Sequence, residues 1–169
     1  LTLNIFNKHA DRLMMANIAQ TVNVLQAVLL TDGEKMVKTP TYYVFKMYKE
    51  HQENTLVGSY ITTENIKSDN DNKTFPQLVE SASVDENGTI YSTVTNTSST
   101  KSAKIKCQVA DTKVESITAE ILTGECHQKN DFDDADNVKT VEFTDFRKLK
   151  DGFTATIPAC SVVKFVINK

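Results

Sequence analysis

Four side-chain amides are the chemically most suggestive residues of this chain. They recur within the apolar segment MANIAQTVNVLQAV, as Asn17, Gln20, Asn23 and Gln26. An amide in a buried segment is costly unless partners satisfy its hydrogen bonds. The four amides could bind local backbone groups, or one of them could face a ligand at the carboxyl end of a buried strand. The residues alone leave both alternatives open.

Side chains that commonly do catalysis form no known motif here. The sequence contains no GxSxG elbow, phosphate-binding loop, HExxH pair or CxxC pair. Its three histidines, His9, His51 and His127, are far apart. His51 falls on the apolar face of a predicted helix, so we expect a packed, hydrogen-bonded ring rather than a catalytic base. The residues alone therefore show no recognisable catalytic motif.

We predict no metal site and no cofactor. The acidic run in NDFDDADN supplies several carboxylates between Asp131 and Asp136. It lacks the central glycine and the closing glutamate that a calcium loop requires. A solvated loop is the favoured interpretation, with an oxygen-bound calcium ion as the alternative. Cys126 and His127 are adjacent, but no second pair of ligands lies nearby in the sequence.

The three cysteines, Cys107, Cys126 and Cys160, are odd in number and widely spaced. This pattern argues against a disulfide framework and against a zinc site. Cys107 alternates with lysines in AKIKCQV and shares a strand face with small and branched apolar residues. We therefore expect a buried thiol at Cys107.

Composition indicates a globular protein, with 40% hydrophobic and 24% charged residues. The net charge of −3 gives no electrostatic basis for binding nucleic acid or an anionic membrane. No apolar run approaches the length that spans a bilayer. Neither nucleic acid nor a membrane is predicted as a partner.

The first third of the chain has mixed periodicity. Apolar residues recur near helical spacing in LNIFNKHADRLMM. The stretch from Met14 to Ala19 is then typical of a strand covered on both faces, as in a parallel sheet. Thr39 and Pro40 predict a helix start, with a hydroxyl cap and proline in the first turn. That helix should run to about Gln52.

From Leu56 onward the period changes to two. The segment from Glu64 to Lys73 is rich in Asn and Asp, and we expect a solvated connection there. A mainly β fold follows, an antiparallel β-sandwich of jelly-roll type. The predicted strands are Leu56–Thr63, Leu78–Val84, Thr89–Thr95, Ala103–Ala110, Val114–Leu122, Val138–Phe143, Phe153–Ile157 and Ser161–Ile167.

The first third of the chain, from LNIFNKHADRLMMANIAQ to TPTYYVFKMYKEHQ, carries a nearly unbroken resemblance to a known family. The resemblance is to the C-terminal part of the α-L-arabinofuranosidases of glycoside hydrolase family 51. It continues more loosely through NDFDDADNVKTVEF and GFTATIPACSVVKFVI. One departure is Tyr43, where the family pattern has histidine. The resemblance implies that residues 1–55 end a (β/α)8 catalytic barrel and that residues 56–169 form a β-sandwich domain.

The family hydrolyses terminal non-reducing arabinofuranosyl residues with retention of configuration, which needs a pair of carboxyl groups. The resemblance implies that both catalytic glutamates lie upstream of Leu1, so this chain should be inactive alone. ANIAQ resembles the eighth barrel strand, which makes Gln20 the candidate substrate-binding residue. Asn17 is the weaker candidate.

The resemblance also implies arabinose-containing glycans as partners of the whole protein, and a homo-oligomer. Its localisation is not fixed by the sequence. LTLNIFNKHADRL lacks the order of a signal peptide, and a secreted or periplasmic bacterial parent is compatible with the chain. The alternative function is a non-catalytic carbohydrate-binding or structural β-sandwich module. Sugar-binding sandwiches usually present exposed aromatic side chains. Here most of the aromatics are expected to pack in the core or at its edge, namely Tyr60, Tyr91, Phe143, Phe146 and Phe153.

Overall fold

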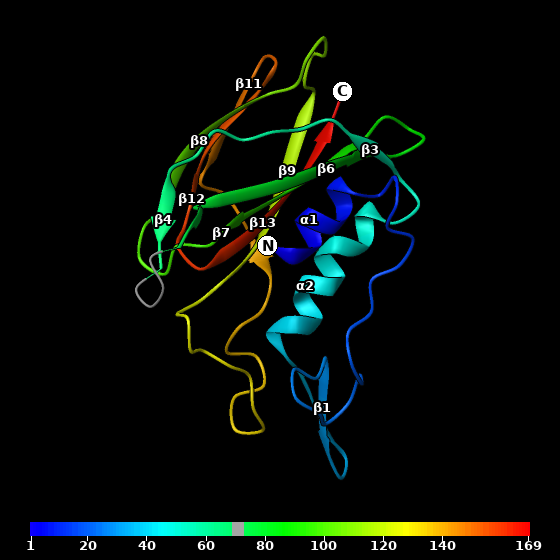
Figure 1. Cartoon of the computed structure of the whole chain (residues 1–169), viewed down its shortest axis with the longest axis vertical. Coiled ribbons are helices and arrows are strands. Elements are labelled where there is room, and N and C mark those ends of the chain that lie inside the picture. The colour runs from blue at the N-terminus through cyan, green and yellow to red at the C-terminus, as the bar shows by residue number, and fades with distance from the viewer. Residues whose placement is uncertain (69–72) are drawn as a thin grey trace.

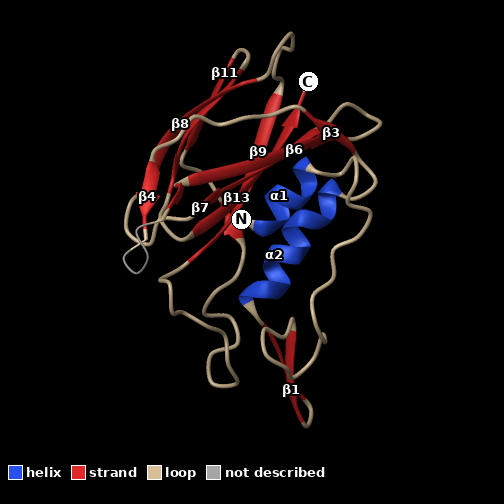
Figure 2. Ribbon diagram, in the orientation of Figure 1, coloured by secondary structure: helices blue, strands red, loops and turns tan. Residues whose placement is uncertain are grey.

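The computed structural model describes residues 1–68 and 73–169. Two antiparallel sheets pack face to face, and two helices cover the outer face of the larger sheet (Figure 1, Figure 2). The prediction of a mainly β, antiparallel sandwich is confirmed. The helices are α1 (Thr2–Lys8) and α2 (Pro40–Tyr48), which continues into the 3-10 turn η1 (Lys49–His51).

The larger sheet has six strands and the smaller has three. In spatial order the larger sheet contains β10 (Val141–Glu142), β9 (Ser116–Thr123), β13 (Ser161–Asn168), β7 (Ile90–Asn96), β6 (Leu78–Val84) and β3 (Thr55–Val57). The smaller sheet contains β11 (Phe146–Leu149), β12 (Gly152–Ile157) and β8 (Ala103–Gln108). Two separate hairpins are formed by β1 (Leu29–Asp32) with β2 (Lys35–Lys38), and by β4 (Asn65–Lys67) with β5 (Thr74–Pro76).

The core lies between the two sheets and is centred on Phe165 of β13. Its fully buried ring lies 4.2 Å from the ring of Phe153 and 6.0 Å from those of Phe143 and Phe146, measured between centroids. Aromatic side chains of this size dominate the energetics of a small core. Cys107 is half-buried against the same core, and burial raises the pKa of its thiol.

Helix α2 begins at Pro40, as predicted, but Thr39 does not cap it with its side chain. The Thr39 hydroxyl instead donates hydrogen bonds to the carbonyls of Ala27 and Val28, at 2.8 and 3.1 Å. This residue therefore ties the start of α2 to the segment before β1. The helical spacing seen near the N-terminus corresponds to the short helix α1 alone.

The structure does not contain the strand that was predicted from Met14 to Ala19. These residues form no strand, and Met14 and Met15 are 94% and 75% exposed. A strand exists only through hydrogen bonds to a neighbour. Among the described residues nothing pairs with this stretch, and the nearest ladder contact is the single bridge between Val22 and Leu29. The expected barrel remnant is thus not evident as a strand.

Strand boundaries in the second half also differ from the prediction. The first predicted strand is reduced to β3, and the one expected up to Phe143 is reduced to β10. Strand β11 was not predicted. Part of the expected connection after Glu64 is the hairpin of β4 and β5, while its residues 69–72 lie outside those described. Short edge strands contain few alternating apolar residues. The sequence pattern that predicts a strand is therefore weak in them and easily missed.

Gly152 permits the close approach of β12 to β8. A Cβ atom at this position would lie 2.0 Å from the carbonyl oxygen of Cys107. Backbone atoms of a paired strand cannot move aside cheaply, so only glycine fits here.

We predict that Gly152→Ala lowers the free energy of unfolding by at least about 2 kcal/mol, because it forces the ladder between β12 and β8 apart. Gly58→Ala is the matched control, since no atom lies within 4 Å of the position of its Cβ. It should change stability by less than about 1 kcal/mol. Chemical denaturation of the two variants measures the difference, and equal midpoints would contradict the role assigned to Gly152.

Candidate functional site

Gln20 lies in the exposed segment between α1 and β1. The segment of residues 16–20 has no regular secondary structure, and Gln20 itself is exposed. No hydrogen bond joins its side chain to any of the residues that the structure describes. Its amide is therefore available to a ligand, and its role in binding substrate stays a prediction.

Asn23 fits the alternative in which an amide binds local backbone groups rather than a ligand. Its amide nitrogen donates to the carbonyl and the hydroxyl of Thr31, both at 3.0 Å. The backbone N–H of Thr31 donates to the Asn23 side-chain oxygen at 2.8 Å. Asn23 also has φ of +54°, a conformation that asparagine tolerates better than most residues. This amide is structural.

Asn17 and Gln26 line one pocket of about 400 Å³, and Gln20 does not belong to it. The pocket lies among α1, α2 and the segment of residues 16–18, and apolar side chains such as Phe6 and Phe45 form most of its wall. The four amides are thus divided among three environments. The structure does not gather them into one site.

A buried polar interface joins the helices to the larger sheet, and Asn4 of α1 lies at its centre. Asn4 is fully buried; its amide donates to the Val79 carbonyl at 2.8 Å and to the Thr95 hydroxyl at 3.2 Å. Its side-chain oxygen accepts hydrogen bonds from the hydroxyls of Tyr48 and Ser81, both at 2.8 Å. Every hydrogen-bonding group of this amide is used, which is the condition for burying it without a large penalty.

His51 extends the same interface at the end of η1. Its two ring nitrogens lie 2.9 Å from the Ser83 hydroxyl and 2.6 Å from the Thr93 hydroxyl. Burial and, second, the charge of Lys164 lower the pKa of His51 to about 4. The ring is therefore neutral at physiological pH and packed, as predicted, rather than poised as a base.

Charged pairs hold the border of this interface. Lys8 of α1 pairs with the buried carboxylate of Glu80, which also accepts a hydrogen bond from Ser59 at 2.6 Å. Lys164 of β13 lies 2.8 Å from Glu120 of β9. These pairs satisfy the charges that the interface buries.

The sequence contains a signal for this interface that was not used. Strands β6 and β7 carry Ser81, Ser83, Thr93 and Thr95 on one face, with no charged residue among them. Strand β8, in contrast, places lysines on its exposed face. Short uncharged polar residues on an outer face indicate that something covers that face. Asn4 gives no such signal, because three of its four partners lie more than 70 positions away in the chain.

The acidic loop is solvated, as predicted. Asp131 accepts hydrogen bonds from the backbone N–H groups of Asp133 and Asp134, both at 3.1 Å, and these bonds lower the pKa of its carboxyl. Within residues 1–68 and 73–169, no three His, Cys, Asp or Glu side chains are grouped so as to hold a metal ion. No helix in the same ranges is long and apolar enough to cross a membrane.

Comparison with known proteins decides the family. A protein-family profile described as the alpha-L-arabinofuranosidase C-terminal domain matches residues 1–161. The chain belongs to this family. Its resemblance to the glycoside hydrolase family 51 arabinofuranosidases is thereby confirmed, and the match includes both the helical first third and most of the sandwich.

Individual relatives agree with this assignment. The chain is 40% identical over 164 residues to a protein of Bacteroides ovatus named intracellular exo-alpha-L-arabinofuranosidase, with 96% of this chain and 32% of that protein covered. The crystal structure of the GH51 arabinofuranosidase from Xanthomonas axonopodis pv. citri superposes with a TM-score of 0.93 at 34% identity, over 99% of this chain and 34% of that one. An alpha-L-arabinofuranosidase of Thermotoga maritima, solved as an arabinose complex, has the same fold, with a TM-score of 0.82 at 24% identity over 97% of this chain and 36% of that one. The chain spans about a third of the length of these relatives.

We predict that acid weakens the fold through His51. The pKa of the ring is lowered in the folded state, so below its ordinary value of 6.5 the unfolded chain takes up the proton first. The free energy of unfolding should therefore fall between pH 6.5 and about 4, and this one group contributes up to about 3 kcal/mol of that fall.

Denaturation at several pH values measures the effect. His51→Gln keeps hydrogen-bonding groups but removes the titration, so its stability should depend less on pH across that window. His9→Gln is the control, because among the described residues the ring of His9 is hydrogen-bonded only to exposed Arg12 and not to the sheet. If His51→Gln and the unmodified chain have parallel pH profiles, His51 is not the group responsible.

Proposed function

We propose that this chain is the C-terminal part of a retaining α-L-arabinofuranosidase, and that it fixes the end of the catalytic barrel to a β-sandwich. Residues 1–55 belong to the barrel side in this proposal and residues 56–169 to the sandwich. The support is family membership together with the buried interface around Asn4 and His51. That interface joins side chains of the first part to strands of the second.

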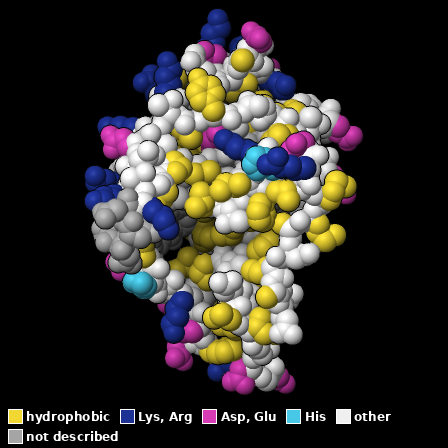
Figure 3. Space-filling view, viewed as in Figure 1, with side chains coloured by type: hydrophobic (Ala, Val, Ile, Leu, Met, Phe, Trp, Pro, Cys, Tyr) yellow, Lys and Arg dark blue, Asp and Glu magenta, His cyan; other side chains and the backbone are white. Residues whose placement is uncertain are grey.

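The observation that carries the proposal is the uneven distribution of exposed apolar side chains. Thirteen large hydrophobic side chains are exposed among the described residues, and seven of them lie within residues 1–25. Those seven are Leu1, Ile5, Leu13, Met14, Met15, Val22 and Leu25. Figure 3 shows hydrophobic side chains gathered over the face where α1 and α2 lie.

A contiguous exposed apolar surface of this kind normally contacts another surface. We assign that contact to the rest of the barrel. A parallel barrel strand is covered on both faces by its neighbours and by helices, which matches the composition of residues 14–19. In the whole protein this stretch would then form the strand that it does not form here.

Gln20 is the proposed substrate-binding residue. Barrel active sites lie at the carboxyl ends of the strands, and Gln20 directly follows the stretch that we assign to the last strand. Its exposed amide could donate to a sugar hydroxyl and accept from another. The substrate class is terminal non-reducing arabinofuranosyl residues of arabinose-containing glycans, and the catalytic carboxyl pair would come from the preceding barrel strands.

The sandwich is assigned a supporting role rather than a sugar-binding one. Phe143 and Phe153 are buried and Phe146 packs against the core, as expected for structural aromatics. Tyr60 was also expected to pack, and this expectation was wrong, because it is 88% exposed. The exposed aromatic side chains of the described sandwich residues are Tyr60, Phe75 and Phe132. They lie on separate segments, with only Phe75 in a strand, so they form no row of aromatics along one strand. A homo-oligomer of the whole protein stays a prediction.

The chain alone should not hydrolyse an aryl arabinofuranoside. Retention needs two carboxyl groups about 5 Å apart at the sugar, and we place both outside this chain. The measurement is release of arabinose by the chain, with the whole protein as the positive control. Arabinose release by the chain alone would overturn the assignment.

Titration with arabinan addresses the alternative function, since saturable binding by the chain alone would favour a carbohydrate-binding module.

Gln20→Ala in the whole protein should lower kcat/KM roughly 3- to 30-fold, the loss expected for one or two hydrogen bonds to a neutral ligand. Its unfolding midpoint should not change, because the side chain binds no described residue. Asn23→Ala is the matched control: it removes hydrogen bonds to Thr31 and should lower stability slightly with kcat/KM unchanged. Unchanged kinetics in Gln20→Ala would remove this residue from the site.

A further inference from the structure

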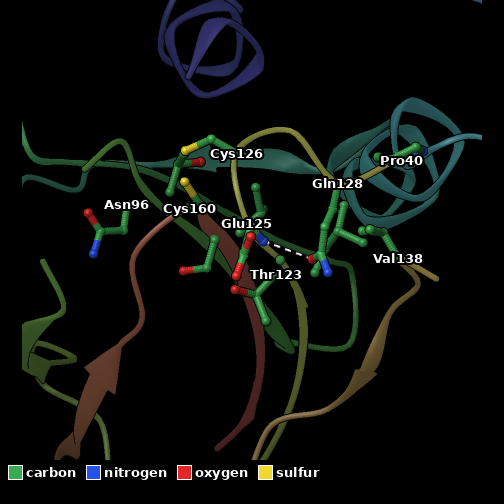
Figure 4. A pocket seen from close by; sticks show the side chains of 13 residues that line it. Pro40, Asn96, Thr123, Glu125, Cys126, Gln128, Val138 and Cys160 are labelled. Carbon is green, nitrogen blue, oxygen red and sulfur yellow. Dashed lines mark hydrogen bonds between the residues drawn. The ribbon is translucent and has the colours of Figure 1, made fainter. Parts of the chain in front are cut away.

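Two cysteines that are far apart in the sequence meet at one end of the larger sheet. Strands β9 and β13 are neighbours, and their register places Thr123 opposite Ser161. Cys126 follows the last residue of β9 by three positions, and Cys160 directly precedes β13. Both side chains line the same pocket of about 330 Å³, and Figure 4 shows their sulfur atoms turned toward each other.

Hydrogen bonds hold the backbone on both sides of this pair. The N–H of Cys160 donates to the Ser98 carbonyl at 2.8 Å. On the other side, the Glu125 N–H donates to the side-chain oxygen of Gln128 at 2.8 Å, the bond drawn in Figure 4. The Gln128 N–H donates back to the Glu125 carbonyl at 3.0 Å. The two sulfur atoms are therefore presented to each other by ordered turns.

Cys160 also has an unusual backbone conformation, with φ of +45°. Residues other than glycine, asparagine and aspartate seldom adopt this region. It is one of five residues other than glycine with positive φ in the described chain. This conformation directs a side chain that would otherwise follow the strand toward the loop that contains Cys126.

The two thiols interact electrostatically. A hydrogen bond to the Cys126 sulfur, followed by burial and by the charge of Cys126, raises the pKa of the Cys160 thiol to about 11. Cys160 therefore keeps its proton at physiological pH. Cys126 is exposed and Cys160 is half-buried, so a reagent in solution meets Cys126 first.

We propose that Cys126 and Cys160 are a modification site, at which a small disulfide such as glutathione disulfide oxidises the pair to a reversible intramolecular disulfide. The spacing in the sequence alone had argued against any disulfide. The pairing of β9 with β13 brings Cys126 and Cys160 close together, although they are far apart in the sequence.

The reaction is two successive thiol–disulfide exchanges. The Cys126 thiolate attacks one sulfur of the oxidant, whose S–S bond breaks and releases one thiolate. This mixed disulfide removes the hydrogen bond and the charge that kept Cys160 protonated. The Cys160 thiolate then attacks the Cys126 sulfur and releases the second thiolate. The two protein thiols lose two electrons, the oxidant becomes two thiols, and these take up the two protons.

The crosslink would tie the turn before β13 to the loop after β9. That loop leads through Gln128 to Val138, which packs against Tyr43 and Met47 of α2. Pro40, the first residue of α2, lines the same pocket as the cysteines. Oxidation would therefore restrict the motion of the sandwich loop that packs against α2.

Peptide mapping of the whole protein tests the proposal. The protein is incubated with glutathione disulfide, free thiols are blocked with N-ethylmaleimide, and trypsin is added without a reductant. Cleavage after lysine places Cys126 in the peptide of residues 114–129, Cys160 in that of residues 151–164, and Cys107 in that of residues 107–113. The expected product joins the first two peptides and leaves Cys107 blocked. Dithiothreitol should separate them.

Two serine variants complete the design. Cys107→Ser is the matched control and should form the same crosslink as the unmodified protein. Cys160→Ser should stop at a stable glutathione adduct on Cys126, because no second thiol resolves it. The proposal is overturned if the unmodified protein carries only separate adducts or blocked thiols on Cys126 and Cys160, or if a crosslink includes Cys107.

Discussion

The buried contact between the two helices and the larger sheet is the interaction on which the rest of this structure depends. A sheet that packs its inner face against a second sheet has an outer face that water can cover. Here the helices α1 and α2 cover it, and they do so largely with polar groups. Asn4 alone joins α1 to Val79 and Ser81 of β6, to Thr95 of β7 and to Tyr48 of α2. A hydrophobic contact tolerates sliding, whereas this set of hydrogen bonds is complete in only one arrangement.

That constraint explains how the chain can be one structural unit although its two parts have different sequence character. Met47 and Tyr48 of α2 form a small second core with Leu122 and Val138, outside the main one. Burial of this apolar cluster stabilises the contact between α2 and the sheet. The hydrogen bonds of the neighbouring amide and hydroxyl groups fix the orientation of the helices. The charged pairs of Lys8 with Glu80 and Lys164 with Glu120 then close the border. The geometry of α1 and α2 relative to the sheet is thus specified by chemistry, not by connectivity alone.

The sequence predicts much of the fold because the long strands carry apolar residues at alternate positions on the face that enters the core. Leu78–Val84 and Ser161–Ile167 were placed correctly or within one residue, since one face of each strand enters the core.

The prediction failed where the determining contact is not local. Met14 to Ala19 has the composition of a buried strand, but a strand needs a neighbour, and none is described here. Asn4 could not be found for the same reason, because its partners come from three other elements. Gln20 illustrates a further limit, since an exposed amide carries no mark in its own surroundings of what it binds.

The two faces of the helical layer have opposite properties, and this difference is informative. Toward the sheet, the hydrogen-bonding groups of Asn4 and both ring nitrogens of His51 have partners, and among the described residues no buried side-chain nitrogen or oxygen lacks one. Away from the sheet, Ile5 of α1 and the methionines that follow α1 expose apolar surface to water. A layer whose polar groups are satisfied on one side and whose other side is apolar normally packs against a further surface on its apolar side. The sandwich is one outer layer, and the family to which the chain belongs supplies the identity that we propose for the other, a catalytic barrel. In that arrangement the polar contact would have a structural consequence. The same hydrogen bonds that hold α1 and α2 in one orientation on the sheet would also set where the segment with Gln20 lies relative to the proposed barrel.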